Sequence, residues 1–511
     1  MALGMSEPLI LRPSDNVAVL TRRAQLGADP LEVGAPLPTS LSAGHKIARQ
    51  DIPVGAPIVK FGQFIGKATT NIVAGDHVHT DNCIFDNPEQ SYAIVADLKA
   101  ARAAIPVTEP LTFQGYLRSD GRVGTRNYIA LLATVNCSAT VIRRAASEIE
   151  ASGLLDAYPD IDGIVALAHG TGCGMAGSGP GFEILDRVLW GHATHPNVGA
   201  AVFVGLGCEV MQIARMQSHF GTGATAHFHG LTIQDSGGTR ATIDAIKDHV
   251  VSLLPTVNGV SRSAQPMSAL RVALQCGGSD GFSGITANPA LGVASDLLVG
   301  QGGTAILAET PEIYGAEQLL LRRAASGAVA QKLIRQIKWW ESYTALNGGS
   351  LDNNPSPGNK QGGITTILEK SLGAVAKGGS TPLTAVYDYA ERVDAPGLVF
   401  MDTPGYDPVS VTGQIAGGAQ VVVFTTGRGS AFGSKPAPTI KLATSDRLFG
   451  TMPDDMDLNT GDILSQGVAI ADKGREIFNL IRATASGQLS KSEALGLGDH
   501  EFVPWQIGAV M

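Results

Sequence analysis

The sequence predicts a mixed α/β protein in which a small β-rich N-terminal domain is followed by two Rossmann-like α/β domains. With 511 residues the chain is long enough for roughly two to four domains, each with its own core. Apolar residues make up 44% and charged residues 16%, alongside 63 glycines, which suits a compact α/β enzyme with many tight turns. From residue 128 onward, short apolar runs alternate with helical stretches, the pattern of parallel sheets.

Residues 1–85 are expected to form the small β domain. Short apolar stretches there are separated by Gly, Pro and Asp turns, and two similar hairpins follow each other. His77 and His79 alternate with Val78 and therefore point to the same face of a strand. They are candidates for binding a metal or a carboxylate, with His79 favoured. The alternative is an exposed hairpin that carries them without function.

Residues 86–110 read as a linker, and a middle α/β domain is expected over residues 111–265. This domain opens with a turn that carries Arg118, Arg122 and Arg126, whose guanidinium groups can receive a carboxylate or a phosphate. A solvated basic turn is the alternative.

Three apolar runs of the middle domain each end in small or polar residues. Ligands of open α/β sheets lie beyond the carboxyl ends of the strands, so the side chains at these ends are candidate site residues. They are His169, Cys173, Cys208 and Glu209. A cysteine in such a place can equally be a small buried apolar residue. Zinc-finger spacing, Walker A and GxGxxG in its strand–turn–helix context are all absent from the sequence, which disfavours structural zinc, ATP and dinucleotides.

The C-terminal domain, residues 266–511, contains two specialised loops. LQCGGSDGFSGITANP (274–289) follows an apolar run, and NNPSPGNKQGG (353–363) repeats its glycine-rich character. Glycines let a backbone approach a ligand closely, and the polar residues between them can bind it. The candidates in these loops are Cys276, Ser279, Asp280, Asn354, Asn359 and Lys360. Two ordinary surface turns are the alternative.

Further along, an expected strand at 304–307 leads to Glu309, and a helix is expected over 316–340. Strands at 395–400 and 420–424 follow, the second leading to Arg428 in a glycine-rich turn. Beyond residue 446 the sequence reads as ordinary acidic surface with a final helix near 470–485.

Charge and cysteine content argue against several classes of protein. A net charge of −9 and no Lys/Arg run argue against nucleic-acid binding. Five widely spaced cysteines argue against a secreted disulfide framework. The start has no signal-peptide pattern, and the most apolar stretch, 198–214, is too short and polar to span a bilayer. A cytoplasmic protein without a membrane span is expected.

Five motifs carry a resemblance to a known family: GRVGTRN (121–127), GLGCE (205–209), QCGGSDGFSGITANP (275–289), NPSPGNKQGGITT (354–366) and FTTGRG (424–429). Over essentially its whole length the chain resembles the altronate dehydratase and galactarate dehydratase family of sugar-acid dehydratases. The resemblance implies an SAF-type N-terminal domain, a divalent metal, iron(II) or manganese(II), and a 2-keto-3-deoxy sugar-acid product. EIYGAEQLL (312–320) is closer to the altronate branch and HGTGCG (169–174) to the galactarate branch, so the substrate stays open between hexonate and hexarate.

The implied hydro-lyase must remove the C2 proton of the acid and expel the C3 hydroxyl, with metal or fixed donors holding the enolate-like charge. We assign catalytic roles to His169, Asp280, Glu309 and Lys360. We assign substrate binding to Arg126, Ser279, Asn354, Asn359 and Arg428. We assign metal binding to His79, Cys173, Cys208, Glu209 and Cys276.

Two other functions stay open. One is a related lyase that expels sulfite from sulfolactate, and the other is a non-catalytic sugar-acid-binding protein. The partners expected are a small sugar acid and a second copy of the chain in a homodimer.

Overall fold

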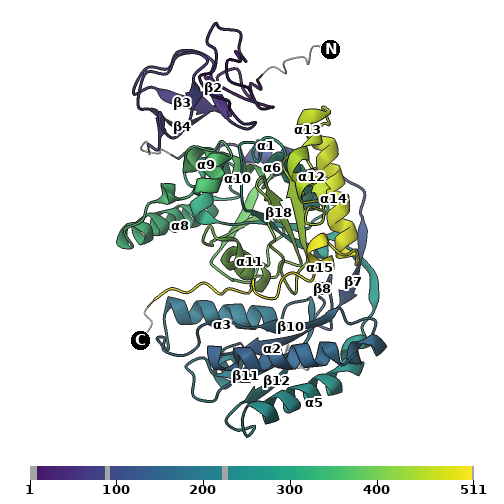
Figure 1. Ribbon diagram of the computed structural model, residues 1–511. Helices are drawn as coiled ribbons and strands as arrows, with labels where there is room; N and C mark the ends of the chain where they lie inside the picture. The colour runs from purple at the N-terminus through teal and green to yellow at the C-terminus, as the bar shows by residue number, and fades with distance from the viewer. Residues whose placement is uncertain (1–7, 87–91, 221–227, 509–511) are drawn as a thin grey trace.

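The computed structural model describes residues 8–86, 92–220 and 228–508, which form three units (Figure 1). The N-terminal β unit (residues 8–86) consists of two three-stranded antiparallel sheets around a core that includes Val17, Ile58 and Ile65. One sheet is β1 (Val17–Val19), β2 (Lys46–Ala48) and β5 (His77–Val78), and the other is β3 (Pro57–Lys60), β4 (Gln63–Ala68) and β6 (Cys83–Ile84). The predicted small β-rich N-terminal part is confirmed.

The second unit is built on the middle sheet, four parallel strands in the order β10-β9-β11-β12. Helices α2 and α5 pack on one face and α3 on the other (Figure 1). The strands are β9 (Tyr128–Ala133), β10 (Gly163–Leu167), β11 (Val198–Gly205) and β12 (Phe228–Thr232), and the helices are α2 (Asn136–Ala151), α3 (Pro180–Ala193), α4 (Ile213–Phe220) and α5 (Thr239–Asn258).

A short antiparallel ribbon and one small helix connect the units. The ribbon pairs β7 (Thr112–Leu117) with β8 (Val123–Gly124) on one side and with β13 (Arg262–Pro266) on the other. Helix α1 (Leu98–Ala103) lies between the N-terminal β unit and the ribbon along the chain.

The third unit is built on the large sheet, seven parallel strands in the order β16-β17-β15-β14-β18-β19-β20. Parallel strands covered on both faces are apolar along their whole length, and β14, β15, β17, β18 and β19 are almost completely buried. The strands are β14 (Arg271–Cys276), β15 (Thr304–Leu307), β16 (Leu383–Tyr387), β17 (Gly397–Met401), β18 (Val421–Thr426), β19 (Thr439–Ala443) and β20 (Leu458–Asn459). A mixed α/β fold with parallel sheets is therefore confirmed.

Helices cover both faces of the large sheet. α6, α10 and α14 contribute to the core of one face, and α11 packs on the other. The helices are α6 (Ala287–Gly300), α7 (Gln318–Leu321), α8 (Gly327–Leu346), α9 (Pro357–Gln361), α10 (Ile367–Ala376), α11 (Asp407–Ala416), α12 (Asp446–Thr451), α13 (Asp462–Ser465), α14 (Ile470–Ala485) and α15 (Lys491–Ala494). No helix in the three described ranges has the length and apolarity needed to cross a membrane.

The helix expected over 316–340 is interrupted, which corrects the sequence prediction. Ala324 forms a β-bridge with Leu383, so the chain leaves the helical path after α7. The Ser326 side chain then accepts a hydrogen bond from Val329 N and caps a new helix, α8.

A buried ion cluster attaches the N-terminal β unit to the large-sheet unit. Lys46 Nζ and Lys60 Nζ lie 2.9 Å and 2.7 Å from the two carboxylate oxygens of Glu369 on α10. Lys46 Nζ also donates to Gly363 O. Burial would raise the pKa of Glu369, but the two lysines hold it well below its ordinary value.

We expect Lys60→Met to weaken this attachment without abolishing it. Glu369 keeps Lys46, so the loss of unfolding free energy should be below the about 3–5 kcal/mol of a fully broken buried pair. Because the Glu369 pKa is depressed, its contribution is present above pH 4.5 and is lost as the pH falls. Denaturant unfolding should show a smaller acid-side loss in Lys60→Met than in wild type, and equal losses would contradict the assigned pairing.

Candidate active site

The strand order of the large sheet reverses at its centre. β15 lies on one side of β14, and β18 lies on the other. In an open α/β sheet this switch point creates a crevice at the carboxyl ends of the strands. The loops after β14 and β18 meet there, since the backbone N–H groups of Gly427 and Arg428 both donate to Gly278 O.

The N-terminal β unit covers this end of the sheet, and a cleft of about 780 Å³ lies between the two units. One wall of the cleft comes from the N-terminal β unit and includes Thr21 and Arg22. Asp280, Gly427 and Arg428 follow β14 and β18. A further wall is formed by residues 444–452 and 461–465. The segment beyond 446, expected to be ordinary surface, is therefore in part a cleft wall.

Asp280 is fixed where the loops meet. Its Oδ1 accepts hydrogen bonds from Phe282 N (3.1 Å) and Ser283 N (3.0 Å), and both oxygens accept from Thr444 Oγ1 at 3.2 Å. A Cβ on Gly427 would lie 2.1 Å from Asp280 Cγ, so this close approach requires glycine. Burial raises the pKa of the Asp280 carboxyl. A carboxyl with a raised pKa beside a cleft is a candidate for proton transfer.

The two glycine-rich loops contact each other. Gly281 N donates to Gly362 O (2.7 Å), and Asn359 Nδ2 donates to Ser279 O (2.8 Å). Ser279 and Asn359 thus hold the loops together, and their side chains are buried. Lys360 follows in the second loop and is half-buried. Among the described residues, no acceptor is bonded to its Nζ.

Three histidines of the N-terminal β unit gather against the second loop. The ring of His79 stacks on those of His45 and His77, which are tilted against each other, and all centroids lie 5.1–5.3 Å apart. His45 Nδ1 lies 3.0 Å from His77 Nε2. His45 Nε2 contacts Gln361 O and His79 Nε2 contacts Lys360 O. Because a carbonyl only accepts, both Nε2 atoms donate and both Nδ1 atoms keep a lone pair.

Burial lowers the pKa of all three histidines, to about 3 for His77. The rings are therefore neutral near pH 7, the form in which imidazole binds a metal.

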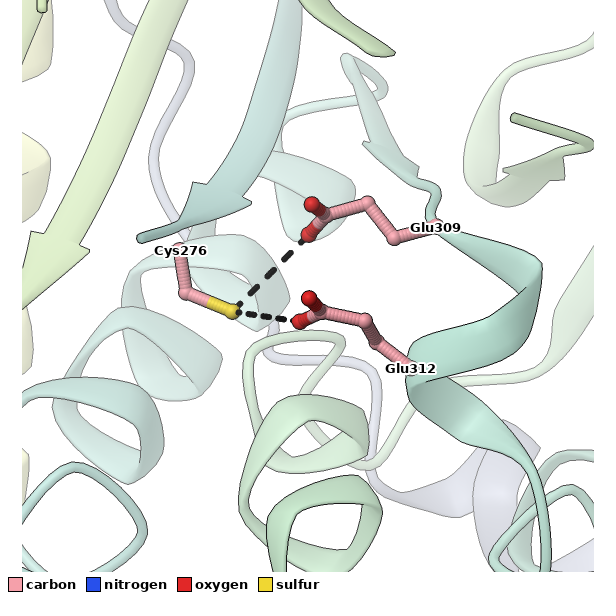
Figure 2. A group of neighbouring side chains, drawn as sticks. All are labelled: Cys276, Glu309 and Glu312. Carbon is pink, nitrogen blue, oxygen red and sulfur yellow. Dashed lines mark hydrogen bonds between the residues drawn. The ribbon is translucent and has the colours of Figure 1, made fainter. Parts of the chain in front are cut away.

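A second cluster, the buried charge cluster, lies at the ends of β14 and β15. The parallel register pairs Leu274 with Leu307, which places Cys276 and Glu309 side by side two residues later. Figure 2 shows Cys276, Glu309 and Glu312 pointing toward one another, with Cys276 Sγ 3.4 Å from Glu312 and 3.8 Å from Glu309. The three donor atoms lie within 4.8 Å of one another. Glu309 has a φ of 71°, a strained value for glutamate.

Two buried lysines already balance the negative charge of this cluster. Lys377 Nζ lies 2.9 Å from Cys276 Sγ and 3.3 Å from Glu309 Oε2. Lys370 Nζ lies 2.7 Å from Glu312 Oε1 and 2.6 Å from Asn354 Oδ1. Asn354 is therefore part of this cluster.

The two carboxylates of the cluster are driven to different protonation states. Burial and the neighbouring Glu312 raise the pKa of Glu309. Burial would also raise the pKa of Glu312, but Lys370 and Lys377 bring it below its ordinary value. Burial raises the pKa of the Cys276 thiol to about 12. Cys276 is 1% and Glu309 0% exposed, so solvent does not reach Glu309 directly.

The middle sheet carries four of the candidates, and none of them lines the cleft. His169 is buried, accepts from Thr171 N through Nδ1 and donates from Nε2 to Ala133 O; burial lowers its pKa to about 4. Glu209 accepts from Thr134 Oγ1 and Gly207 N. Cys173 and Cys208 are exposed.

Arg126 is 1% exposed and binds Glu493 through two guanidinium nitrogens. It also donates to three backbone carbonyls. These contacts favour a structural role for Arg126.

Sequence reasoning missed several charged groups around the site. Lys370 and Lys377 are seven residues apart, a spacing that places two side chains on one helix face, and this signal was available. None of the glycine-rich motifs contains Arg22, His45 or Arg447. Arg22 and His45 reach the site only because the N-terminal β unit docks on the large-sheet unit.

Comparisons with known proteins agree along the whole chain. The altronate/galactarate dehydratase SAF domain matches residues 6–85, the second domain of D-galactarate dehydratase/altronate hydrolase matches 115–258, and the D-galactarate/altronate dehydratase C-terminal domain matches 267–510. The SAF domain and the family resemblance are thereby confirmed.

Among individual relatives, the chain is 34% identical to altronate dehydratase of Bacillus subtilis over 94% of the chain and 96% of the relative. It is 36% identical to galactarate dehydratase (L-threo-forming) of Escherichia coli over 93% of the chain and 92% of the relative. It is also 31% identical to (2R)-sulfolactate sulfo-lyase subunit beta of Chromohalobacter salexigens over 77% of the chain and 96% of the relative. The chain belongs to the D-galactarate/altronate dehydratase family.

Proposed function

We propose that the chain is a sugar-acid hydro-lyase that removes water from a hexonate or hexarate and yields a 2-keto-3-deoxy sugar acid. The observation that carries the proposal is the cleft at the switch point of the large sheet, which Asp280 and Arg428 both line. Two dehydratases of this family, similar over nearly the whole chain, support the reaction class. Incubating the protein with hexonates and hexarates and measuring 2-keto acid formation tests it.

The reaction needs a base for the C2 proton, an acid for the leaving hydroxide and a cation for the carboxylate. Arg428 can bind the carboxylate bidentately. The raised pKa of Asp280 lets its carboxyl carry a proton closer to neutral pH, as the acid requires. We assign the base to Lys360, which directly precedes the cleft-lining Gln361 and whose amine has no acceptor among the described residues. Glu309 is completely buried, and both ring nitrogens of His169 are already hydrogen-bonded to the backbone. These environments favour structural rather than proton-transfer roles for the two residues.

We further propose that a divalent metal, Fe²⁺ or Mn²⁺, binds at the cluster of His45, His77 and His79. Each neutral ring has one nitrogen lone pair, and His45 is bonded to Gln361, which lines the cleft. The lone pair of His45 Nδ1 faces His77 Nε2 at 3.0 Å, so a bound metal would replace that contact. Cys276, Glu309 and Glu312 are the other donor set, but Lys377 lies between Cys276 and Glu309, and a second cation there would be repelled. A metal bound beside the cleft would act as a Lewis acid for the enolate-like charge.

Metal removal gives a direct prediction. Chelator-treated protein should lose turnover and regain it with Fe²⁺ or Mn²⁺. His77→Ala should lower the bound metal per chain measured by elemental analysis, whereas Cys276→Ser should retain it. Full metal content in His77→Ala with loss in Cys276→Ser would move the ion to the buried charge cluster.

The relative that is a sulfolactate sulfo-lyase subunit favours one alternative, a lyase that expels sulfite. Assaying released sulfite with sulfolactate separates the two reactions. Turnover of any of these acids would exclude a purely non-catalytic binding protein.

The finer domain picture is also a proposal. Two features support a pair of Rossmann-like domains. The middle sheet has four parallel strands in the order β10-β9-β11-β12, and the strand order of the large sheet reverses at β14. The matched segments support boundaries near 1–85, 86–110, 111–265 and 266–511. The homodimer and the cytoplasmic location stay predictions, and light scattering after size-exclusion chromatography tests the first.

A further inference from the structure

Each wall of the cleft contributes one arginine. Arg428 follows β18, Arg447 lies on α12, and Arg22 belongs to the N-terminal β unit. All three side chains are exposed. They therefore present three guanidinium groups to one cavity from three different parts of the fold.

The acids of the cleft form no ion pair with these arginines, which outnumber them three to two in the lining. Among the described residues, none of the three arginines forms an ion pair. Asp280 uses its carboxylate on Thr444 and on the backbone of its own loop. Asp446, the other acid in the lining, accepts from Asn459 Nδ2 at 2.6 Å. The cleft is a locally positive region in a chain of net charge −9.

We propose that the cleft is built for a dicarboxylate, so that the substrate is a hexarate rather than a hexonate; this rests on the proposed dehydratase function. Arg428 lies against the loop that carries Asp280, since its Cβ is 3.3 Å from the position a Cβ would take on Gly278. It binds the carboxylate next to the reacting carbons. Arg22 and Arg447, on the other two walls, bind the distal carboxylate.

The distinction follows from the chemistry of the sixth carbon. A hexarate carries a carboxylate there, which a planar guanidinium binds with two parallel hydrogen bonds. A hexonate carries a neutral hydroxymethyl group, which leaves Arg22 and Arg447 without an anionic partner. The affinity gained at the distal end is therefore available to the dicarboxylate alone.

Steady-state kinetics with galactarate and altronate test this inference. In the metal-loaded full chain, kcat/KM should be higher for galactarate. Arg22→Ala and Arg447→Ala should each lower the galactarate-to-altronate ratio of kcat/KM by about 10- to 100-fold, the loss of one charge-assisted contact. Arg428→Ala should lower both values and change the ratio less. Arg23→Ala, which removes an exposed arginine outside the cleft lining, is the matched control and should leave the ratio unchanged.

The outcomes separate the two proposals. A wild-type preference for altronate, or an unchanged ratio in both Arg22→Ala and Arg447→Ala, would overturn the dicarboxylate site while the dehydratase function stands. Turnover of neither acid would overturn the function. Calorimetric binding of galactarate then decides the site: binding weakened by Arg447→Ala supports it, and no binding, or binding insensitive to this change, overturns it.

Discussion

Asp280→Asn is expected to lower kcat by about 10²- to 10⁴-fold, the usual contribution of one general acid or base. The asparagine side chain has the same shape, so it fits against Gly427 and still offers one oxygen to the N–H groups of Phe282 and Ser283. The group that can carry and release a proton is gone. Single-turnover measurement of 2-keto acid formation reports the loss independently of product release.

The control for this change is Asp446→Asn. Asp446 lines the same cleft but is hydrogen-bonded to Asn459 on its wall, so kcat should stay within about three-fold of wild type, a small energy on the scale of catalysis. Thermal unfolding should show both variants folded. A normal kcat in Asp280→Asn would remove this residue from the chemistry and leave Lys360 as the remaining proton-transfer candidate in the glycine-rich loops.

Strand ends could be predicted from the sequence because buried parallel strands read as apolar runs that stop at glycine or a polar residue. β15 (Thr304–Leu307) lies where the pattern places it, and α14 (Ile470–Ala485) has the bounds expected from its helical pattern. The two glycine-rich loops were recognisable for a related reason: their glycines serve close backbone approaches, as at Gly281 and Gly363, which both pack on Gly44.

The environment of each side chain could not be predicted in the same way. Glu309 was correctly expected after a strand, but its lysine partner comes from the end of α10, far along the chain. Arg126 lies in a turn rich in arginine, and its partner Glu493 lies near the C-terminus. No local pattern distinguishes a guanidinium that binds substrate from one that is already satisfied, because the difference is a tertiary contact.

Lys377→Met is expected to destabilise the fold more than any other single substitution proposed above, at about 3–5 kcal/mol of unfolding free energy at pH 9, where Glu309, whose pKa is raised to about 8, is ionised. Lys377 is completely buried, and its ammonium group is the common partner of Cys276 and Glu309. Methionine fills a similar volume, so the main loss is electrostatic rather than a cavity. Lys338→Met, which changes an exposed lysine on α8, should stay within about 0.5 kcal/mol of wild type.

Adding Glu309→Gln to Lys377→Met tests whether charge is the cause. The double variant no longer contains the carboxylate that Lys377 compensates, so it should be more stable than Lys377→Met alone, and a double-mutant cycle measures the coupling. The size of the destabilisation also depends on pH. Burial raises the pKa of Glu309, so the carboxyl binds its proton more tightly in the folded protein, and stability falls as the pH rises through the folded-state pKa. Without Lys377 that pKa rises further, and the destabilisation by Lys377→Met should therefore be larger at pH 9 than at pH 6 in denaturant unfolding. A pH-independent effect that Glu309→Gln does not relieve would show that Lys377 stabilises the fold by packing alone.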